Sequence, residues 1–126
     1  MNIFLWILQI LLAAQFLWHG WIMVFPPPEL LDIINANVGT WQRIFIGVSE
    51  ALGALGLILP GLTRTLPRLT VWSAVGLMIV AISASVYHLM RGEISSSIYT
   101  AVLFVIILFV AIMRWKVKPT ANKEIQ

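Results

Sequence analysis

The chain has 126 residues, of which 60% are hydrophobic and 10% charged, and its mean hydropathy is +0.96. This composition excludes an ordinary soluble domain and indicates a membrane protein. Cysteine is absent, which excludes disulfide bonds, thiolate metal sites and a dithiol relay, so any redox chemistry would need a bound cofactor.

Four long apolar intervals follow one another along the chain, each long enough to cross a bilayer. They predict transmembrane helices near residues 3–25, 41–60, 69–90 and 96–115. The first should be retained in the mature protein, because no Lys or Arg precedes it and three prolines, not a small-residue cleavage site, follow it.

The connectors between these helices predict their arrangement. Prolines favour an extended start to the 26–40 connector, and residues 29–34 are compatible with a short amphipathic helix at the membrane surface. Pro60 and Gly61 are expected to close the second helix, and a tight link at Gly92 joins the third helix to the fourth. Short links make sequential helices antiparallel neighbours. The predicted fold is therefore an all-α, integral membrane four-helix antiparallel bundle.

One domain, residues 1–117, is expected, followed by a disordered basic tail, residues 118–126. Four spans put both termini and the connector between the second and third helices on one side. That side collects Arg64, Arg68, Arg114, Lys116, Lys118 and Lys123. The positive-inside rule then predicts a multi-pass protein of the cell membrane with cytoplasmic N- and C-termini.

The formal net charge of +3 is explained by this topology. Anionic lipid headgroups are a sufficient partner for the basic tail, so membrane lipids are expected as partners and nucleic acid is not. A homodimer, and a redox or client membrane protein as partner, stay open.

Glu50 is the one carboxylate within the apolar stretch 44–63. An ionisable group inside a membrane is costly, and by default it marks a functional site. At about 1.5 Å rise per residue, Glu50 and Gln15 lie about 15 Å from the outer boundary, and His19 about 9 Å. The inner ends of the first and fourth helices, 3–8 and 102–113, are wholly apolar. This distribution predicts a polar pocket that opens outward and is closed below.

The catalytic candidates are the titratable side chains of the spans: Glu50 as proton donor or acceptor, with His19 and His88. Candidate ligand-binding residues share the outer half of the bundle: Gln15, Trp18, Arg43, Ser85, Tyr87 and Tyr99. On the third helix, Ser85 and His88 share one face and Tyr87 lies on another, and the sequence leaves open which face is internal.

Structural interpretations stand beside these functional ones. Glu50 could fix helix packing alone, Arg43 could snorkel to the interface, and the histidines could join helices by hydrogen bonds. Bis-histidine haem is disfavoured, because the depths of His19 and His88 differ by about 5 Å. With Glu50 they also lack a local metal-binding motif, so no metal is predicted.

The segment 47–64, GVSEALGALGLILPGLTR, resembles the second-helix signature of the DoxX and DoxX-like family. In that signature a membrane-embedded Glu, here Glu50, precedes closely spaced glycines and a cytoplasmic turn. His88 and the four-span length are also similar to the shorter DoxX-like branch. The resemblance implies links to quinone-dependent respiratory oxidoreductases, thiosulfate oxidation and oxidative stress, or, in a distant animal branch, to receptor assembly.

Two functions from different classes follow. The first is a quinone-associated redox accessory subunit: His19 or His88 would hydrogen-bond a quinone carbonyl, and Glu50 would exchange the accompanying proton. Without an intrinsic cofactor, such a subunit needs a partner that delivers electrons. The alternative is a non-catalytic assembly or chaperone-like factor that binds a partner helix or a lipid. Proton-coupled transport is a third and weaker hypothesis, which would require a dimer.

Overall fold

The computed structural model describes residues 2–63, 66 and 68–117, and all regular secondary structure in this part of the chain is helical. The elements in order are α1 (Asn2–Val24), α2 (Pro28–Asn37), α3 (Thr40–Thr63), α4 (Leu69–Met90), α5 (Ile94–Ile112) and the π-helical turn η1 (Met113–Val117). Helices α1, α3 and α4, and α5 together with most of η1, are long and apolar enough to span a membrane. The all-helical membrane fold predicted from the sequence is confirmed. The predicted tail, residues 118–126, lies outside the described residues.

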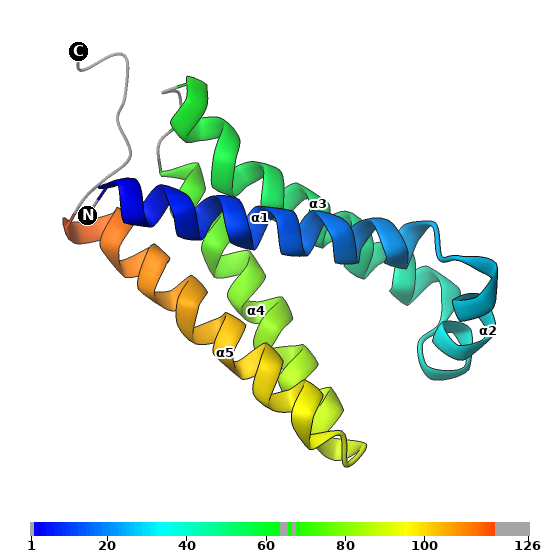
Figure 1. The fold of residues 1–126 in the computed structure, drawn as a ribbon. Helices are drawn as coiled ribbons and strands as arrows, with labels where there is room; N and C mark the ends of the chain where they lie inside the picture. Colours follow the sequence, from blue (N-terminus) through cyan, green and yellow to red (C-terminus); the bar gives the residue numbers. More distant parts are fainter. Residues whose placement is uncertain (1, 64–65, 67, 118–126) are drawn as a thin grey trace.

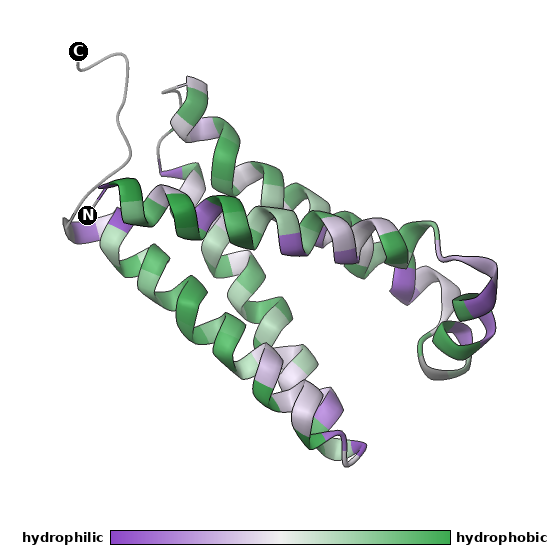
Figure 2. Cartoon of the chain, viewed as in Figure 1, coloured by the Kyte–Doolittle hydropathy of each residue, from purple (hydrophilic) through white to green (hydrophobic). Residues whose placement is uncertain are grey.

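The long helices form two antiparallel pairs (Figure 1). Helix α1 packs along α3, α4 packs along α5, and α3 also contacts α4. The two pairs meet at the end of the bundle that carries the N-terminus and diverge toward the opposite end, where α2 caps the α1/α3 pair (Figure 1). Hydrophobic residues cover most of the long helices, and hydrophilic ones concentrate at α2, at the α4–α5 turn and at the ends of the described part of the chain (Figure 2).

Two connectors differ from the sequence-based expectation. Helix α3 does not close at Pro60 but continues to Thr63, with Pro60 buried inside it. Proline is tolerated within a membrane helix because neighbouring groups can satisfy the backbone that it frees. A helix is present in the first connector and is longer than the predicted residues 29–34: α2 begins at Pro28, a favourable first helical position, and ends where Val38 becomes extended.

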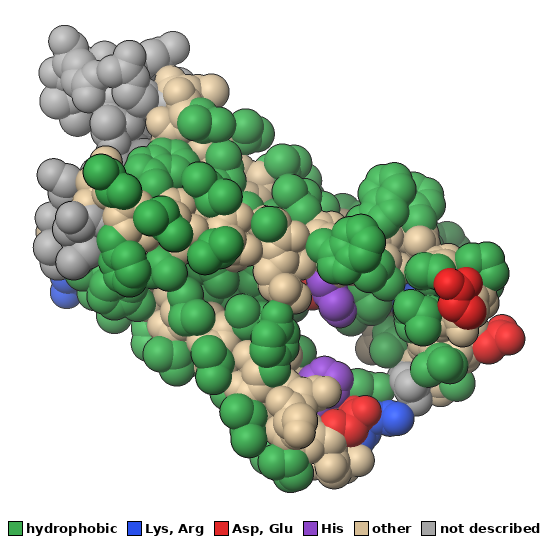
Figure 3. Space-filling model, viewed as in Figure 1, with side chains coloured by type: hydrophobic (Ala, Val, Ile, Leu, Met, Phe, Trp, Pro, Cys, Tyr) green, Lys and Arg blue, Asp and Glu red, His purple; other side chains and the backbone are tan. Residues whose placement is uncertain are grey.

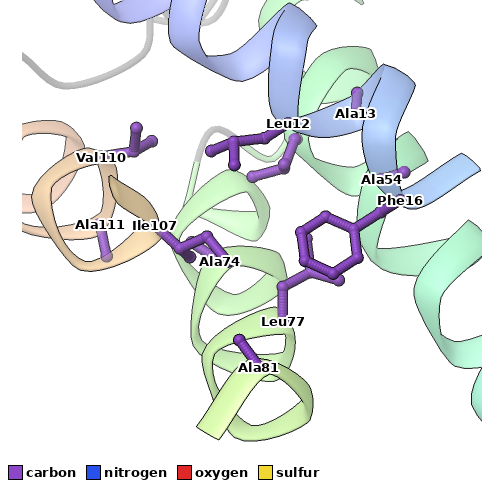
Figure 4. Packing of buried hydrophobic residues seen from close by; sticks show 11 residues of the cluster. Leu12, Ala13, Phe16, Ala54, Ala74, Leu77, Ala81, Ile107, Val110 and Ala111 are labelled. Atoms are coloured by element: carbon purple, nitrogen blue, oxygen red, sulfur yellow. The ribbon is translucent and has the colours of Figure 1, made fainter. Parts of the chain in front are cut away.

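The hydrophobic core lies where the two pairs meet (Figure 4). It takes side chains from all four long helices, including Leu12 and Phe16 of α1, Ala54 and Leu57 of α3, Ala74 and Leu77 of α4, and Ile107 and Val110 of α5. In contrast, many large apolar side chains, such as Leu52, Ile79 and Val105, are exposed. So much exposed apolar surface indicates contact with lipid.

Candidate functional site

Glu50 of α3 is buried against α1. Only 3% of its surface is exposed, and its Oε2 lies 2.6 Å from Nδ1 of His19. The His19 side chain is 50% exposed, so the imidazole links a buried carboxylate to the accessible surface of the bundle. A hydrogen bond this short is typical of a charge-assisted pair.

Glycines on the two helices set this geometry. A Cβ added to Gly20 would lie 2.7 Å from the carbonyl oxygen of Gly47, and one added to Gly47 would lie 2.8 Å from that of Gly20. The backbones of α1 and α3 therefore touch beside His19 and one turn from Glu50. Larger residues at either position would separate the imidazole from the carboxylate.

Arg43 holds the end of α1. Its Nη1 donates to the carbonyl oxygen of Met23 and, at 3.3 Å, to that of Val24, the last residue of the helix. These bonds satisfy terminal carbonyls and place a positive charge at the negative end of the helix dipole. Because Arg43 is buried, the snorkelling interpretation is wrong. In this arrangement the guanidinium fixes α1 on α3.

On α4 the internal face carries Ala81 and Ser85, which are buried, whereas Ser83 and Tyr87 are exposed. Ser85 Oγ donates to the carbonyl oxygen of Ser97 at 2.9 Å, and Ser97 Oγ donates to that of Ser85 at 2.9 Å. This reciprocal pair joins α4 to α5. Ser85 was predicted to bind a ligand, but its hydroxyl is engaged in helix packing.

His88 lies near the α4–α5 turn and bonds a different carboxylate from His19. Its Nδ1 is 3.0 Å from Oε1 of Glu93, which also accepts from Nε of Arg91 at 3.2 Å. The hydrogen bond from His88, assisted by Arg91, lowers the pKa of the Glu93 carboxyl. The structure therefore does not bring His88 to Glu50; it creates a second histidine–glutamate pair at the end of α4.

The predicted aromatic residues lie at the surface. Trp18 is 66% exposed and is two positions from the buried residues Phe16 and Gly20, which puts it on the opposite face of α1. Trp18 thus faces away from the bundle and does not wall a site within it. Tyr99 is exposed as well, and the Tyr87 ring packs edge-on against the His88 ring. Gln15 is half-buried, one helical turn from His19.

The space between the diverging pairs is hollow (Figure 3). Histidine side chains lie on both sides of this hollow, one on each helix pair (Figure 3). The two histidines of the chain are His19 in α1 and His88 in α4. Each therefore presents an imidazole toward the space between the pairs while its Nδ1 pairs with a glutamate.

A polar cluster at the opposite end of the bundle was missed by the sequence analysis. Gln9, fully buried, donates from Nε2 to the carbonyl oxygen of Leu57 at 2.6 Å and accepts at Oε1 from Nε of Arg114 at 2.7 Å. Arg114 also donates to Oδ1 of Asn2 at 2.8 Å. The apolar runs 3–8 and 102–113 end just before Gln9 and Arg114, so this end of the bundle is not closed by apolar side chains alone. The available signal was Gln9 itself, a polar side chain that directly follows the apolar run 3–8.

Among the described residues, no group of three His, Asp or Glu side chains is placed to hold a metal ion. What the geometry defines is a small multi-pass membrane protein whose second span buries a carboxylate against a histidine of the first. A family model described as the DoxX-like family matches residues 7–110, and the chain belongs to this family. The match includes both histidine–glutamate pairs. Comparisons with curated proteins and with solved structures find no match.

Proposed function

We propose that this DoxX-like protein is a quinone-associated redox accessory subunit whose headgroup site is the His19–Glu50 pair. The observation that carries the proposal is a carboxylate buried in a membrane span and hydrogen-bonded to a half-exposed imidazole. Ionisable groups in spans are expensive and usually functional. A buried acid coupled to an accessible histidine has the two properties that proton exchange with a membrane-dissolved ligand requires.

The chemistry follows from the two nitrogens of His19. Nδ1 is engaged by Glu50, so Nε2 is the nitrogen that meets a ligand. The imidazolium donates from Nε2 to a quinone carbonyl oxygen, and Glu50 stabilises its positive charge. When the quinone gains two electrons, its two oxygens take two protons. His19 supplies one from Nε2, becomes neutral, and accepts a hydrogen bond from the resulting hydroxyl. The second proton, and the one that later restores the imidazolium, come from hydronium ions of the bulk solvent.

The electrons come from a partner protein in this proposal, because the chain has no cysteine pair and reduction of a quinone needs a donor. This assignment makes the protein an accessory subunit rather than a complete oxidoreductase. The partner would approach the hollow between the α1/α3 and α4/α5 pairs, to which His19 is accessible.

The test is quinone binding by protein reconstituted in lipid nanodiscs, followed by quenching of tryptophan fluorescence. A dimethoxy-methyl-benzoquinone should bind the unaltered protein at a single site. Glu50→Gln and His19→Gln should each weaken binding tenfold or more, with elution volume and helix content unchanged. Ser83→Ala, at an exposed position of α4, is the matched control. Equal affinity in the unaltered protein and both site variants would reject the proposal.

An assembly factor is the second candidate, favoured by the hollow between the pairs, which a partner helix could fill (Figure 3). Its prediction differs from that of the quinone proposal. Glu50→Gln would reduce the abundance of a co-purified membrane protein while the quinone content of the preparation stayed constant. Mild-detergent purification with mass spectrometry of both proteins and lipids measures the two outcomes together.

A further inference from the structure

An arginine and two tryptophans form a stack where the start of α4 contacts η1. The guanidinium carbon of Arg68 lies 4.4 Å from the centre of the Trp115 ring, and the Trp115 ring meets that of Trp72 edge-on at 6.3 Å between centres. Arg68 directly precedes α4, whereas Trp115 belongs to η1. The stack therefore holds the guanidinium in place at the end of the bundle where the two helix pairs meet.

Stacking leaves the hydrogen-bond donors of Arg68 for another partner. An arginine uses the face of its planar group against a ring, while its N–H bonds point outward in the plane. No hydrogen bond or ion pair joins the Arg68 side chain to another residue in the described part of the chain. Arg68 is exposed, and so is Lys116, the residue that follows Trp115. Two accessible cations therefore accompany the Trp115 ring.

No described carboxylate offsets these charges at this end of the bundle. The acidic residues of the described ranges are Glu29 and Asp32 in α2, Glu50 in α3 and Glu93 in the α4–α5 turn. Helix α2 and the α4–α5 turn lie at the opposite end, where the pairs diverge (Figure 1), and Glu50 is paired with a histidine. The positive surface thus favours a negatively charged molecule from outside the chain.

The π-helical turn separates this surface from the interior. Arg114, which is buried, donates to side chains of α1, whereas Trp115 and Lys116, the next two residues, are exposed. π-Helical turns are rare and often occur at functional sites. Because Arg114 is engaged inside the bundle, the surface cations are the ones that a ligand can reach.

The rings beside these cations indicate the kind of ligand. Trp72 and Trp115 are both exposed, and tryptophan concentrates where the hydrocarbon of a bilayer meets the headgroups. Ile112, about one turn before Trp115, is exposed as well, so apolar surface adjoins the cations. An anionic phospholipid matches both parts, with a phosphodiester for the guanidinium and acyl chains for the apolar surface. A soluble phosphate matches only the first.

We propose that Arg68 and Lys116, with the Trp115 ring that holds Arg68, bind the phosphodiester headgroup of one anionic phospholipid. The guanidinium donates two N–H groups to the phosphate oxygens, and the ammonium of Lys116 adds a second positive charge. Anionic lipids occur in the cytoplasmic leaflet, which is where the positive-inside rule places this end of the bundle. The inference uses other residues than the quinone proposal and does not depend on it.

Native mass spectrometry of the detergent-purified protein counts bound lipids and tests the inference. Phosphatidylglycerol and phosphatidylcholine with the same acyl chains are compared, and the first phosphatidylglycerol should bind about tenfold or more tightly than the first phosphatidylcholine. A basic residue near an anionic headgroup contributes about fivefold to binding. Arg68→Gln and Lys116→Gln should therefore each weaken phosphatidylglycerol binding about fivefold and leave phosphatidylcholine binding unchanged.

Arg91→Gln is the matched control. Arg91 also lies over an aromatic ring, that of Tyr87, but it is paired with Glu93 at the opposite end of the bundle. The substitution changes the net charge by the same amount as Arg68→Gln and should not alter phosphatidylglycerol binding. If Arg68→Gln fails to fold, Trp115→Leu replaces it: this variant keeps both charges but removes the ring that holds the guanidinium, and it should also weaken binding.

Three results would overturn the inference. Equal affinities of the unaltered protein for the two lipids would mean that no headgroup is selected. Equal losses in Arg68→Gln and Arg91→Gln would mean that overall charge, and not this site, attracts the lipid. Displacement of the bound lipid by millimolar glycerol 3-phosphate would mean that the site recognises a soluble phosphate.

Discussion

Gly20 of α1 and Gly47 of α3 contact each other backbone to backbone, and this contact positions the His19–Glu50 pair. A side chain at either glycine would meet a carbonyl oxygen of the opposite helix, so no rotamer change could relieve the clash. The spacing of the functional pair therefore depends on two residues that have no side chain of their own.

Gly47→Leu should consequently separate α1 from α3. Overpacking at a close helix contact costs about 1–3 kcal/mol, and we expect a lower unfolding temperature together with weaker quinone binding. Differential scanning fluorimetry in detergent measures the first effect. Gly76→Ala, where the new Cβ meets open space, is the control and should leave the unfolding temperature unchanged or higher. Equal unfolding temperatures for Gly47→Leu and the unaltered protein would contradict the close contact.

Arg43→Met should loosen the end of α1. The substitution keeps the apolar stem but removes the charged donor to the Met23 and Val24 carbonyl oxygens. Hydrogen bonds from charged groups contribute about 1.5–3 kcal/mol, so a loss of this order is expected in unfolding measurements. Arg43→Lys keeps the charge and should retain part of the stability. Faster amide hydrogen exchange confined to the last turn of α1 would locate the effect.

Ser85 and Ser97 should be energetically coupled. Each hydroxyl bonds the backbone carbonyl of the other residue, and the two oxygens are 3.1 Å apart. Single substitutions to alanine and the double substitution form a thermodynamic cycle, for which we expect a coupling of about 0.6 kcal/mol, the mean found for hydrogen bonds between membrane helices. A coupling near zero would mean that the reciprocal pair does not stabilise the α4/α5 contact.

Acid should weaken the α4–α5 turn. The pKa of Glu93 is lowered in the folded chain, chiefly by its hydrogen bond from His88, so the ionised carboxylate favours the folded turn. That contribution is complete above the ordinary Glu pKa of about 4.3 and is lost as pH falls through the lower folded pKa. NMR titration of the Glu93 side chain should show this lowered midpoint. His88→Ala should move it back toward the ordinary value, whereas Ser95→Ala, at an exposed position beyond the turn, should not.

The sequence predicted the parts of the fold that depend on local pattern. Charge-free intervals locate the four spans, because a bilayer admits only long apolar helices, and the lone carboxylate in one of them singles out Glu50. The face of α4 could not be predicted, since polar side chains such as Ser83 and Ser85 occur on both sides of that helix. Contacts between distant segments could not be predicted either. Gln9 and Arg114 are 105 positions apart and meet only when α1 packs against the end of α5.

The end of α3 was predicted wrongly from the local pattern around Pro60. Next to Gly61, Pro60 reads as a helix stop, yet in lipid an early end to α3 would expose unpaired backbone groups, so the helix continues. The roles predicted for His19, Glu50 and His88 in chemistry stay predictions, although their positions are now defined.

The α1/α3 and α4/α5 pairs meet at one end of the bundle and diverge toward the other (Figure 1). A rotation of one pair relative to the other at the shared end therefore changes the distance between the pairs at the open end. A rotation of about 6° at the shared core, acting over a lever of about 20 Å, changes the gap at the far end by about 2 Å while leaving each pair internally intact. Repacking around Leu12, Phe16 and Leu77 would therefore change the distance between the pairs at their open end without breaking the contacts within either pair.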